Sequence, residues 1–291
     1  MKISNLIIVD SVYSIYLYSL IRKANITDCL FIVSDGIPKV IRDKIPNIYY
    51  IPSKNKKYLR RLFSSLALIK FRLKHKKATF IGHDHLFYSY IFLKNGFILL
   101  EDGSVNFKKY NSISLSNKVK ELLIGSKLFG FSNKIKKIYL TDGAPILEDK
   151  IKKKVELINI KNMFDDLSDE GKERIKKLFS FSCGNNLIID RLLITQPFSE
   201  DGRMTENEKV AMYIDIMKTY SISAIKPHPR ELTDYSKYTS ISIIPSHIPF
   251  QLIQELVSIS EIISLSSTAN NSIECKVRAL GDSIIECYKR K

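Results

Sequence analysis

The chain has 291 residues, 45% of them hydrophobic and 26% charged, which is the composition of a globular protein with room for two α/β domains. No stretch of about 18 residues lacks charges, and the apolar run at residues 6–9 is too short for a signal peptide, so a soluble or peripheral protein is expected. The 46 Lys and Arg outnumber the 30 Asp and Glu, and the net charge of +16 predicts an anionic partner: nucleic acid, an anionic membrane face or a charged substrate.

Strand and helix patterns alternate through the first half of the chain. Apolar, β-branched runs predict strands, and an apolar helix at 13–22 separates the first two of them. This alternation is typical of a Rossmann-like domain with a parallel sheet. The predicted strands of this half are residues 6–9, 30–33, 48–51, 78–81, 97–100 and 138–140.

Acidic residues follow one of these strands. Glu101, Asp102 and Gly103 come directly after the strand at 97–100. An Asp-Gly pair is common in β-turns, but carboxylates past the end of a parallel strand are also typical of an active site. The sequence supports the two interpretations about equally.

Cysteine and histidine spacing gives little indication of a metal. The four cysteines form no CxxC pair, and their scatter through a chain of this length indicates a reducing cytoplasm. His83 and His85 could ligate a metal, but two histidines without a third ligand are a weak signal. We expect them to be polar strand-end residues near the substrate cleft, in reach of an acceptor.

Residues 54–77 combine ten Lys and Arg with apolar residues at helical spacing. A basic amphipathic helix of this kind can lie on an anionic membrane. The favoured interpretation is an ordinary surface helix with its apolar stripe on the domain core, whose basic face could still dock on lipid headgroups. The apolar positions are Leu59, Leu62, Phe63, Leu66, Ile69 and Leu73.

The second half contains a βαβ pattern that brings ionisable residues to one edge of a sheet. A buried strand at 187–194, a helix capped by Thr205 with Glu208, and a strand at 221–225 are predicted. The carboxyl ends of parallel strands share an edge, where open α/β sheets hold ligands. A carboxylate and an imidazole there are the minimum equipment for a general base and a general acid. The residues concerned are Gln196, Glu200 and Asp201 after the first strand, and Lys226, Pro227, His228, Pro229 and Arg230 after the second.

A hydroxyl-rich segment follows the last predicted strand, at 262–265. Ser266, Ser267 and Thr268 precede a predicted helix at 273–280. A helix N-terminus with several hydroxyls favours phosphate, whereas simple capping needs only one of them. We place the domain boundary so that the domains are residues 1–165 and 166–291.

Three motifs together resemble bacterial sialyltransferases of glycosyltransferase family 52, of the lipooligosaccharide or capsule type. They are Thr195-Gln196-Pro197, Lys226-Pro227-His228-Pro229-Arg230 and Ser266-Ser267-Thr268. Glu101-Asp102-Gly103 and the first strand–turn–helix also fit, so the resemblance spans the chain. It implies an α/β, GT-B-like fold: two Rossmann-like domains with parallel sheets facing a central cleft, the first on the acceptor side and the second binding the CMP nucleotide.

The resemblance implies inverting transfer of sialic acid from CMP-sialic acid to a terminal galactose of a cell-surface glycan, lipooligosaccharide or capsule, without metal or cofactor. His228 would be the general acid at the departing phosphate. The family's base follows the proline of the first motif, whereas here the carboxylates lie a few residues further on. The order of preference is Asp201, then Glu200, with Asp102 as the rival. The substrate-binding residues would be Gln196, Gly103, Lys226, Pro229, Arg230, Ser266, Ser267 and Thr268.

Two alternatives remain beside this interpretation. One is a related GT-B enzyme with another nucleotide-sugar, for glucosyl or Kdo transfer, or a polysialyltransferase. The other is a basic membrane-surface or nucleic-acid binding protein. We do not expect a nucleic-acid partner, because the chain shows no helix-turn-helix, RRM or zinc-finger pattern. A homodimer in the cytoplasm, peripheral on the anionic inner membrane surface, is expected.

Overall fold

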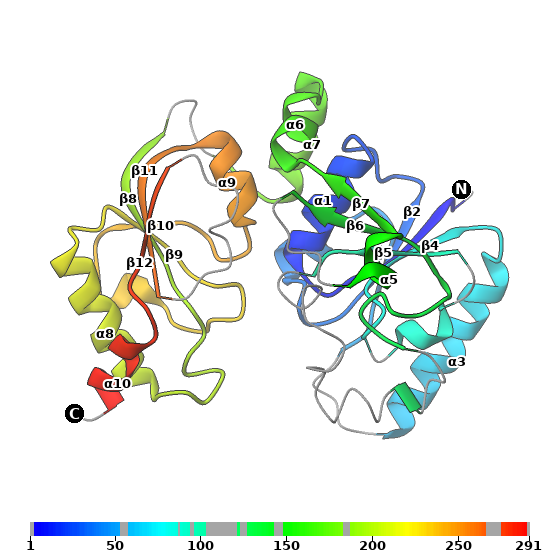
Figure 1. The fold of residues 1–291 in the computed structure, drawn as a ribbon, viewed down its shortest axis with the longest axis horizontal. Coiled ribbons are helices and arrows are strands. Elements are labelled where there is room, and N and C mark those ends of the chain that lie inside the picture. The colour runs from blue at the N-terminus through cyan, green and yellow to red at the C-terminus, as the bar shows by residue number, and fades with distance from the viewer. Residues whose placement is uncertain are drawn as a thin grey trace. The chain divides into compact units, whose positions relative to one another are not determined.

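A computed structural model describes residues 3–52, 58–86, 88–93, 96–102, 121–122, 127–142, 148–182, 187–265 and 275–289 (Figure 1). The chain divides into an N-terminal unit, residues 1–178, and a C-terminal unit, residues 179–291. This division falls after helix α7 (Asp169–Leu178), whereas the boundary placed at 165/166 falls before it. Each unit is described by itself.

The N-terminal unit is built on a sheet of seven parallel strands in the order β3-β2-β1-β4-β5-β6-β7. All strands of the first predicted set are present. The strands are β1 (Asn5–Ile8), β2 (Cys29–Val33), β3 (Ile48–Tyr50), β4 (Thr79–Gly82), β5 (Phe97–Leu100), β6 (Ile135–Thr141) and β7 (Val155–Ile158). Because β1 and β2 are buried along their whole length, they read as continuous apolar runs, as central parallel strands do.

Helices flank this sheet (Figure 1). Ser11 caps α1 by accepting a hydrogen bond from the Ser14 N–H, and α1 buries most of its length. The described helices are α1 (Val12–Ile21), α2 (Lys39–Arg42), α3 (Tyr58–Lys74), the 3-10 turn η1 (Ser89–Ile91), α5 (Asp149–Lys152), α6 (Ile160–Asp165) and α7.

The C-terminal unit repeats the plan with five parallel strands in the order β10-β9-β8-β11-β12. The strands are β8 (Ile188–Ile194), β9 (Ala224–Lys226), β10 (Ser242–Ile243), β11 (Ser258–Ser264) and β12 (Lys276–Ala279). The helices are α8 (Glu206–Thr219), the 3-10 turn η4 (Tyr235–Lys237), α9 (Phe250–Leu256) and α10 (Ser283–Lys289). The predicted capping box of α8 is confirmed: Thr205 and Glu208 bond reciprocally.

The helix predicted at 273–280 is wrong over its described part, because β12 pairs in parallel with β11 there. Lys276 and Arg278 point to the same neighbour, Glu261 on β11, at 3.4 and 3.0 Å. Alternate residues point to the same side in a strand, and these cross-strand ion pairs stabilise the pairing of the edge strand β12 with β11. The argument for phosphate at the N-terminus of that helix therefore loses its basis.

Both sheets have a point where the strand order reverses, between β1 and β4 in one and between β8 and β11 in the other. Open α/β sheets hold ligands at such points, outside the carboxyl ends of the strands. The described helices include none that is long and apolar enough to cross a membrane.

Candidate functional site

The first group of candidate residues lies at the carboxyl edge of the N-terminal sheet. β4 ends at Gly82, whose φ is +141°, and a Cβ there would lie 1.9 Å from the carbonyl oxygen of Ile8. Only glycine permits this approach, and it lets the His83 N–H donate to that same carbonyl oxygen at 2.8 Å. His83 is therefore fixed to the ends of β1 and β4 together.

Asp102, after β5, lies beside both histidines. Its Oδ2 is 3.3 Å from His85 Nε2 and 3.7 Å from His83 Nδ1. Burial raises the pKa of Asp102, but the adjacent His83 and His85 rings outweigh it and bring the pKa to about 2. The sequence suggested that residues 83, 85 and 102 share an edge, and the structure brings all three together with an ionised carboxylate.

Ser14 orients this cluster, and the sequence analysis missed it. Its hydroxyl donates to the Glu101 carbonyl oxygen at 3.0 Å and lies 2.7 Å from His83 Nε2. Because the Ser14 hydroxyl donates its proton to the Glu101 carbonyl oxygen, it can only accept a hydrogen bond from His83. The ring proton of His83 is therefore on Nε2. The signal available in the sequence was the capped start of helix α1 directly after β1, because it places Ser14 at the carboxyl edge of the sheet.

Glu101 has a structural role, although it precedes Asp102 directly. Its Oε2 accepts the Thr141 N–H at 2.6 Å and the Thr141 hydroxyl at 2.8 Å, and its Oε1 accepts from the Tyr13 hydroxyl at 3.2 Å. Burial raises its pKa. The side chain ties α1 to β6 and supports the backbone that presents Asp102.

The group formed by His83, His85 and Asp102 offers three ligand atoms within 4.8 Å of one another. The two imidazole rings lie 5.5 Å apart between centroids, with 13° between their planes. Imidazole nitrogens and a carboxylate oxygen are ligands that a metal ion can use, and they can equally hydrogen-bond a substrate.

The second group lies at the carboxyl edge of the C-terminal sheet, where β9 leads into the turn that carries His228. The His228 N–H donates to Glu231 at 2.8 Å, and the Tyr235 hydroxyl donates to the same carboxylate at 2.8 Å. The Thr195 hydroxyl, at the end of β8, also donates to Glu231. Glu231, directly after the predicted motif, thus fastens the His228 turn to the neighbouring strand.

The His228 ring has a defined tautomer. Its Nδ1 accepts the Arg230 N–H at 3.1 Å, so in the neutral ring Nε2 carries the proton. Burial, together with the nearby cationic Arg230 and Lys226, lowers its pKa to about 4. In the ligand-free protein at neutral pH, His228 is a neutral imidazole with an Nε2–H donor.

Lys226 supports this turn from inside. It is 3% exposed, and its Nζ donates to the carbonyl oxygens of Pro227 and Ser246 at 2.8 and 2.9 Å. Burial lowers its pKa to about 7. The ammonium is committed to backbone groups, which favours a positioning role over contact with a donor.

The two carboxylates after β8 are both engaged. Glu200 pairs with buried Lys209 at 2.9 Å and accepts the Leu232 N–H at 2.7 Å; burial raises its pKa, but these bonds prevail and hold it at about 2. Asp201 makes a two-pronged ion pair with Arg230, at 2.7 and 3.2 Å, on the surface. Glu200 therefore has a structural role as an ion-pair partner of Lys209, and Asp201 orients the Arg230 guanidinium.

Lys209 is the centre of an ionic cluster that the sequence did not indicate. Fully buried on α8, its Nζ lies 2.9 Å from Glu200, 3.0 Å from Glu206 and 3.6 Å from Glu231.

Removing one partner of a buried ionic cluster such as that of Lys209 leaves uncompensated charge. We expect Lys209→Met to lower the free energy of unfolding by about 3 kcal/mol, measured by urea denaturation. Lys218→Met, at an exposed position of the same helix, is the control, and an equal loss in both variants would contradict this role.

The remaining predicted positions are distributed as follows. Gln196 follows β8, and its N–H donates to the Tyr213 hydroxyl at 2.7 Å. Pro229 is exposed within the His228 turn. Gly103, Ser266, Ser267 and Thr268 lie outside the described residues.

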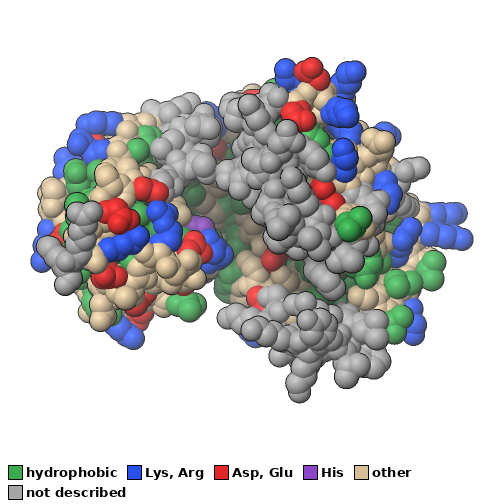
Figure 2. Space-filling model, turned by 60° about the horizontal axis from the view of Figure 1, so that its bottom comes forward, with side chains coloured by type: hydrophobic (Ala, Val, Ile, Leu, Met, Phe, Trp, Pro, Cys, Tyr) green, Lys and Arg blue, Asp and Glu red, His purple; other side chains and the backbone are tan. Residues whose placement is uncertain are grey.

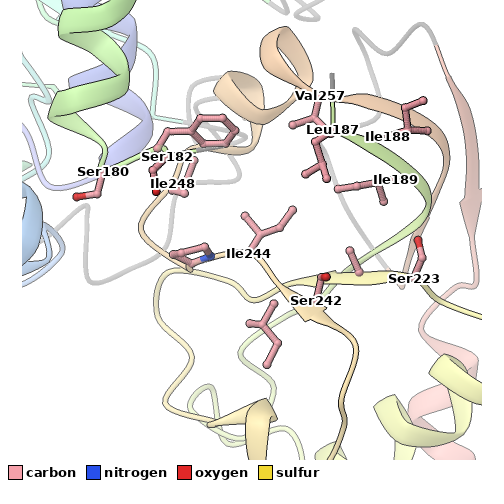
Figure 3. Close-up of a pocket in the computed structure, with 14 residues that line it drawn as sticks. Ser180, Ser182, Leu187, Ile188, Ile189, Ser223, Ser242, Ile244, Ile248 and Val257 are labelled. Atoms are coloured by element: carbon pink, nitrogen blue, oxygen red, sulfur yellow. The ribbon is translucent and has the colours of Figure 1, made fainter. Parts of the chain in front are cut away.

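An apolar cavity of about 260 Å³ lies elsewhere in the C-terminal unit. Leu187, Ile189 and Ile244 are among its lining side chains (Figure 3). It takes in the start of β8 and, through Ser223 and Ala224, the start of β9. Neither Thr195 nor His228 is among the residues that line it.

The surface charge is mixed. On the face shown in Figure 2, Lys and Arg side chains lie in several separate groups with Asp and Glu among them. A nucleic-acid site usually gathers its basic residues into one patch or stripe. The described part of this face shows no single patch of that kind.

Comparison with known proteins gives a consistent assignment. Two solved structures share the fold: a sialyltransferase from Photobacterium damsela (12% identity, TM-score 0.50, 94% of this chain and 73% of that one) and the UDP-GlcNAc 2-epimerase of Neisseria meningitidis bound to UDP-GlcNAc (14%, 0.51, 97% and 83%). With the two parallel sheets, they confirm the predicted α/β, GT-B-like class. An uncharacterized protein of Haemophilus influenzae is 34% identical over 277 residues, 90% of this chain and 89% of that one. The family model for glycosyltransferase family 52 matches residues 37–279, and the chain belongs to this family.

Proposed function

We propose that the protein is a sialyltransferase that moves sialic acid from CMP-sialic acid to a terminal galactose of a cell-surface glycan, with inversion. The family assignment supports glycosyl transfer, and the motif resemblance supports the donor. The observation that carries the chemistry is the His228 turn, which leaves an Nε2–H as donor on a ring that feels the positive charge of Arg230. A hydrogen-bond donor next to a cation suits an anionic leaving group.

In the proposed reaction the acceptor oxygen forms a bond to the anomeric carbon of sialic acid while the bond from that carbon to the phosphate oxygen breaks. The electron pair leaves with CMP. His228 Nε2–H hydrogen-bonds the departing phosphate oxygen, and the anion raises the pKa of the imidazole from about 4, so that the ring can take up a proton from solvent and pass one to that oxygen as an imidazolium. The proton of the acceptor hydroxyl passes to a carboxylate base.

We propose Asp102 as that base. Asp201, the first choice from sequence, is paired with Arg230 through both carboxylate oxygens, and Glu200 is held by Lys209. Asp102 is ionised, its Oδ2 lies 3.3 Å from His85 Nε2, and its remaining hydrogen bond is to the neutral Ser11 hydroxyl and not to a cationic Lys or Arg. His85 can relay the proton that Asp102 takes up, because its ring lies directly beside that oxygen.

The test is incubation of the protein with CMP-sialic acid and a labelled galactoside. Formation of a sialylated product is expected. Absence of both transfer and donor hydrolysis contradicts the proposal. Thermal-shift measurements with CMP, UDP and other nucleotides separate it from the alternative GT-B donors, since only cytidine nucleotides should raise the melting temperature.

Transfer should need no metal, because the proposed acid and base are both side chains of the protein. We expect the rate to stay within about twofold after EDTA treatment, since no step uses a Lewis acid. The measurement is product formation before and after chelation, with added Zn²⁺ and Mg²⁺ as the reverse experiment. A rate that EDTA abolishes and Mg²⁺ restores contradicts this part of the mechanism.

A further inference from the structure

Helix α3 lies on the outside of the N-terminal unit (Figure 1), and it exposes a stripe of large apolar side chains. Leu66, Ile69 and Leu73 are 50%, 42% and 67% exposed. Their spacing of three and four residues places them along one side of the helix. The expectation that this stripe packs on the domain core is wrong for these three residues.

A different side of α3 attaches the helix to its own unit. Leu68 is fully buried in the core, and Phe71 packs edge-on against Tyr49 with ring centroids 4.9 Å apart. At 100° per residue, both lie more than a quarter turn away from Leu66 and Leu73. The exposed stripe is therefore a second apolar face, which the fold of this unit leaves in contact with solvent.

Basic residues border this second face. Lys70 and Lys74 are exposed and, by helical spacing, lie along its flank, and the exposed Lys77 follows in the turn after the helix. The sequence from 58 to 77 contains no Asp or Glu, so its charge is positive throughout. An apolar ridge bordered by lysines is complementary to a surface that is anionic outside and apolar just beneath.

We propose that this ridge of α3, formed by Leu66, Ile69 and Leu73 with Lys70 and Lys74, docks the protein on an anionic lipid bilayer together with Lys77, which follows the helix. The ammonium groups contact lipid phosphates, and the apolar side chains enter the boundary between headgroups and acyl chains. A second copy of the chain would place the same lysines against each other. A nucleic-acid backbone would leave the apolar side chains without partners.

The chain contains no tryptophan, which allows a direct test. Leu73→Trp introduces a single indole on the ridge. Its fluorescence should shift to the blue on addition of phosphatidylglycerol vesicles and stay unchanged with phosphatidylcholine vesicles. Leu157→Trp, at a 52%-exposed position on β7, is the matched control and should not respond. Equal responses at both positions, or none at position 73, overturn the proposal.

Charge reversal gives the second test. Lys70→Glu, Lys74→Glu and Lys77→Glu together should weaken co-sedimentation with phosphatidylglycerol vesicles by about a hundredfold or more, because each lysine near the surface strengthens binding by about fivefold. The same reversal at Lys136, Lys150 and Lys153 changes the net charge equally and should weaken binding by less than about tenfold. Equal losses in the two variants overturn the proposal.

The Leu73→Trp fluorescence could instead shift with protein concentration in the absence of vesicles. That result would identify the ridge as a contact between copies of the chain and would overturn the membrane proposal. The readouts are lipid binding and self-association, and α3 contributes no group to the proposed reaction. Failure of the sialyltransferase assignment and failure of this inference are therefore distinguishable.

Discussion

His228→Ala should lower kcat for sialyl transfer about 10³-fold with little change in KM, because the variant loses the proton donor at the leaving phosphate. General acid assistance acts in the transition state, where charge develops on that oxygen, and contributes little to binding of the ground state. The measurement is steady-state transfer from CMP-sialic acid to a soluble galactoside. His75→Ala, which removes a histidine next to α3, is the control and should retain the parent rate.

A structural role for His228 can be separated from a chemical one by following the protonation of the ring. NMR titration of the His228 ring should give a pKa near 4 in the free protein and a higher value with CMP bound, since an anion at Nε2 stabilises the imidazolium. A kcat that survives His228→Ala, or a pKa that CMP does not move, is incompatible with the proposed acid.

The same low pKa has a consequence for stability. The folded protein holds the His228 pKa below the unfolded value of about 6.5, so folding favours the neutral ring. This contribution is complete above about pH 6.5 and is lost as the pH falls from there towards 4. In a comparison of urea unfolding across this range, His228→Asn should lose stability less steeply than the parent protein.

Asp102→Asn should lower kcat by about 10³-fold, the second large effect, because an amide cannot accept the acceptor's proton. Asp201→Asn should act mainly on KM, by less than about tenfold, since it only loosens the Arg230 guanidinium. The pair decides between the two candidate bases. A larger kcat loss in Asp201→Asn than in Asp102→Asn would return the assignment to the second motif.

Chemical rescue distinguishes a missing base from a disturbed fold. In Asp102→Gly, added formate can occupy the vacated space and accept the proton, and it should restore part of the lost rate. Formate should have no effect on His228→Ala, where the missing group is an acid. A rate loss in Asp102→Gly that formate leaves unchanged, together with a lowered melting temperature, would indicate a structural role.

The sequence predicted the strands well where burial makes them apolar runs, as in β1 and β2. It failed at two edge strands, β7 and β12. β7 exposes Glu156 and Leu157, and two of the four residues of β12 are charged, so neither has the pattern of a buried strand. Edge strands depend on pairing with a neighbour, and that pairing is not encoded in local periodicity.

The site could be predicted only in its outline. The position of Asp102 and His228 after strands follows from local sequence, because parallel strands end at a common edge. The inward direction of Lys226, the capture of Glu200 by Lys209 and the role of Ser14 depend on contacts between distant segments. Spacing along the chain therefore identified the candidate carboxylates without showing which of them were already engaged.

The bonds of Glu231 determine how much rearrangement donor binding would require in the His228 turn. Three hydrogen-bond donors, from the end of β8, the turn itself and η4, converge on this carboxylate. The imidazole is therefore oriented before the nucleotide-sugar binds. The entropy lost in aligning the ring belongs to folding and is not repeated in each catalytic cycle. Glu231→Gln should then leave the imidazole chemistry intact while broadening the range of ring orientations, a penalty that appears in turnover and not in nucleotide affinity.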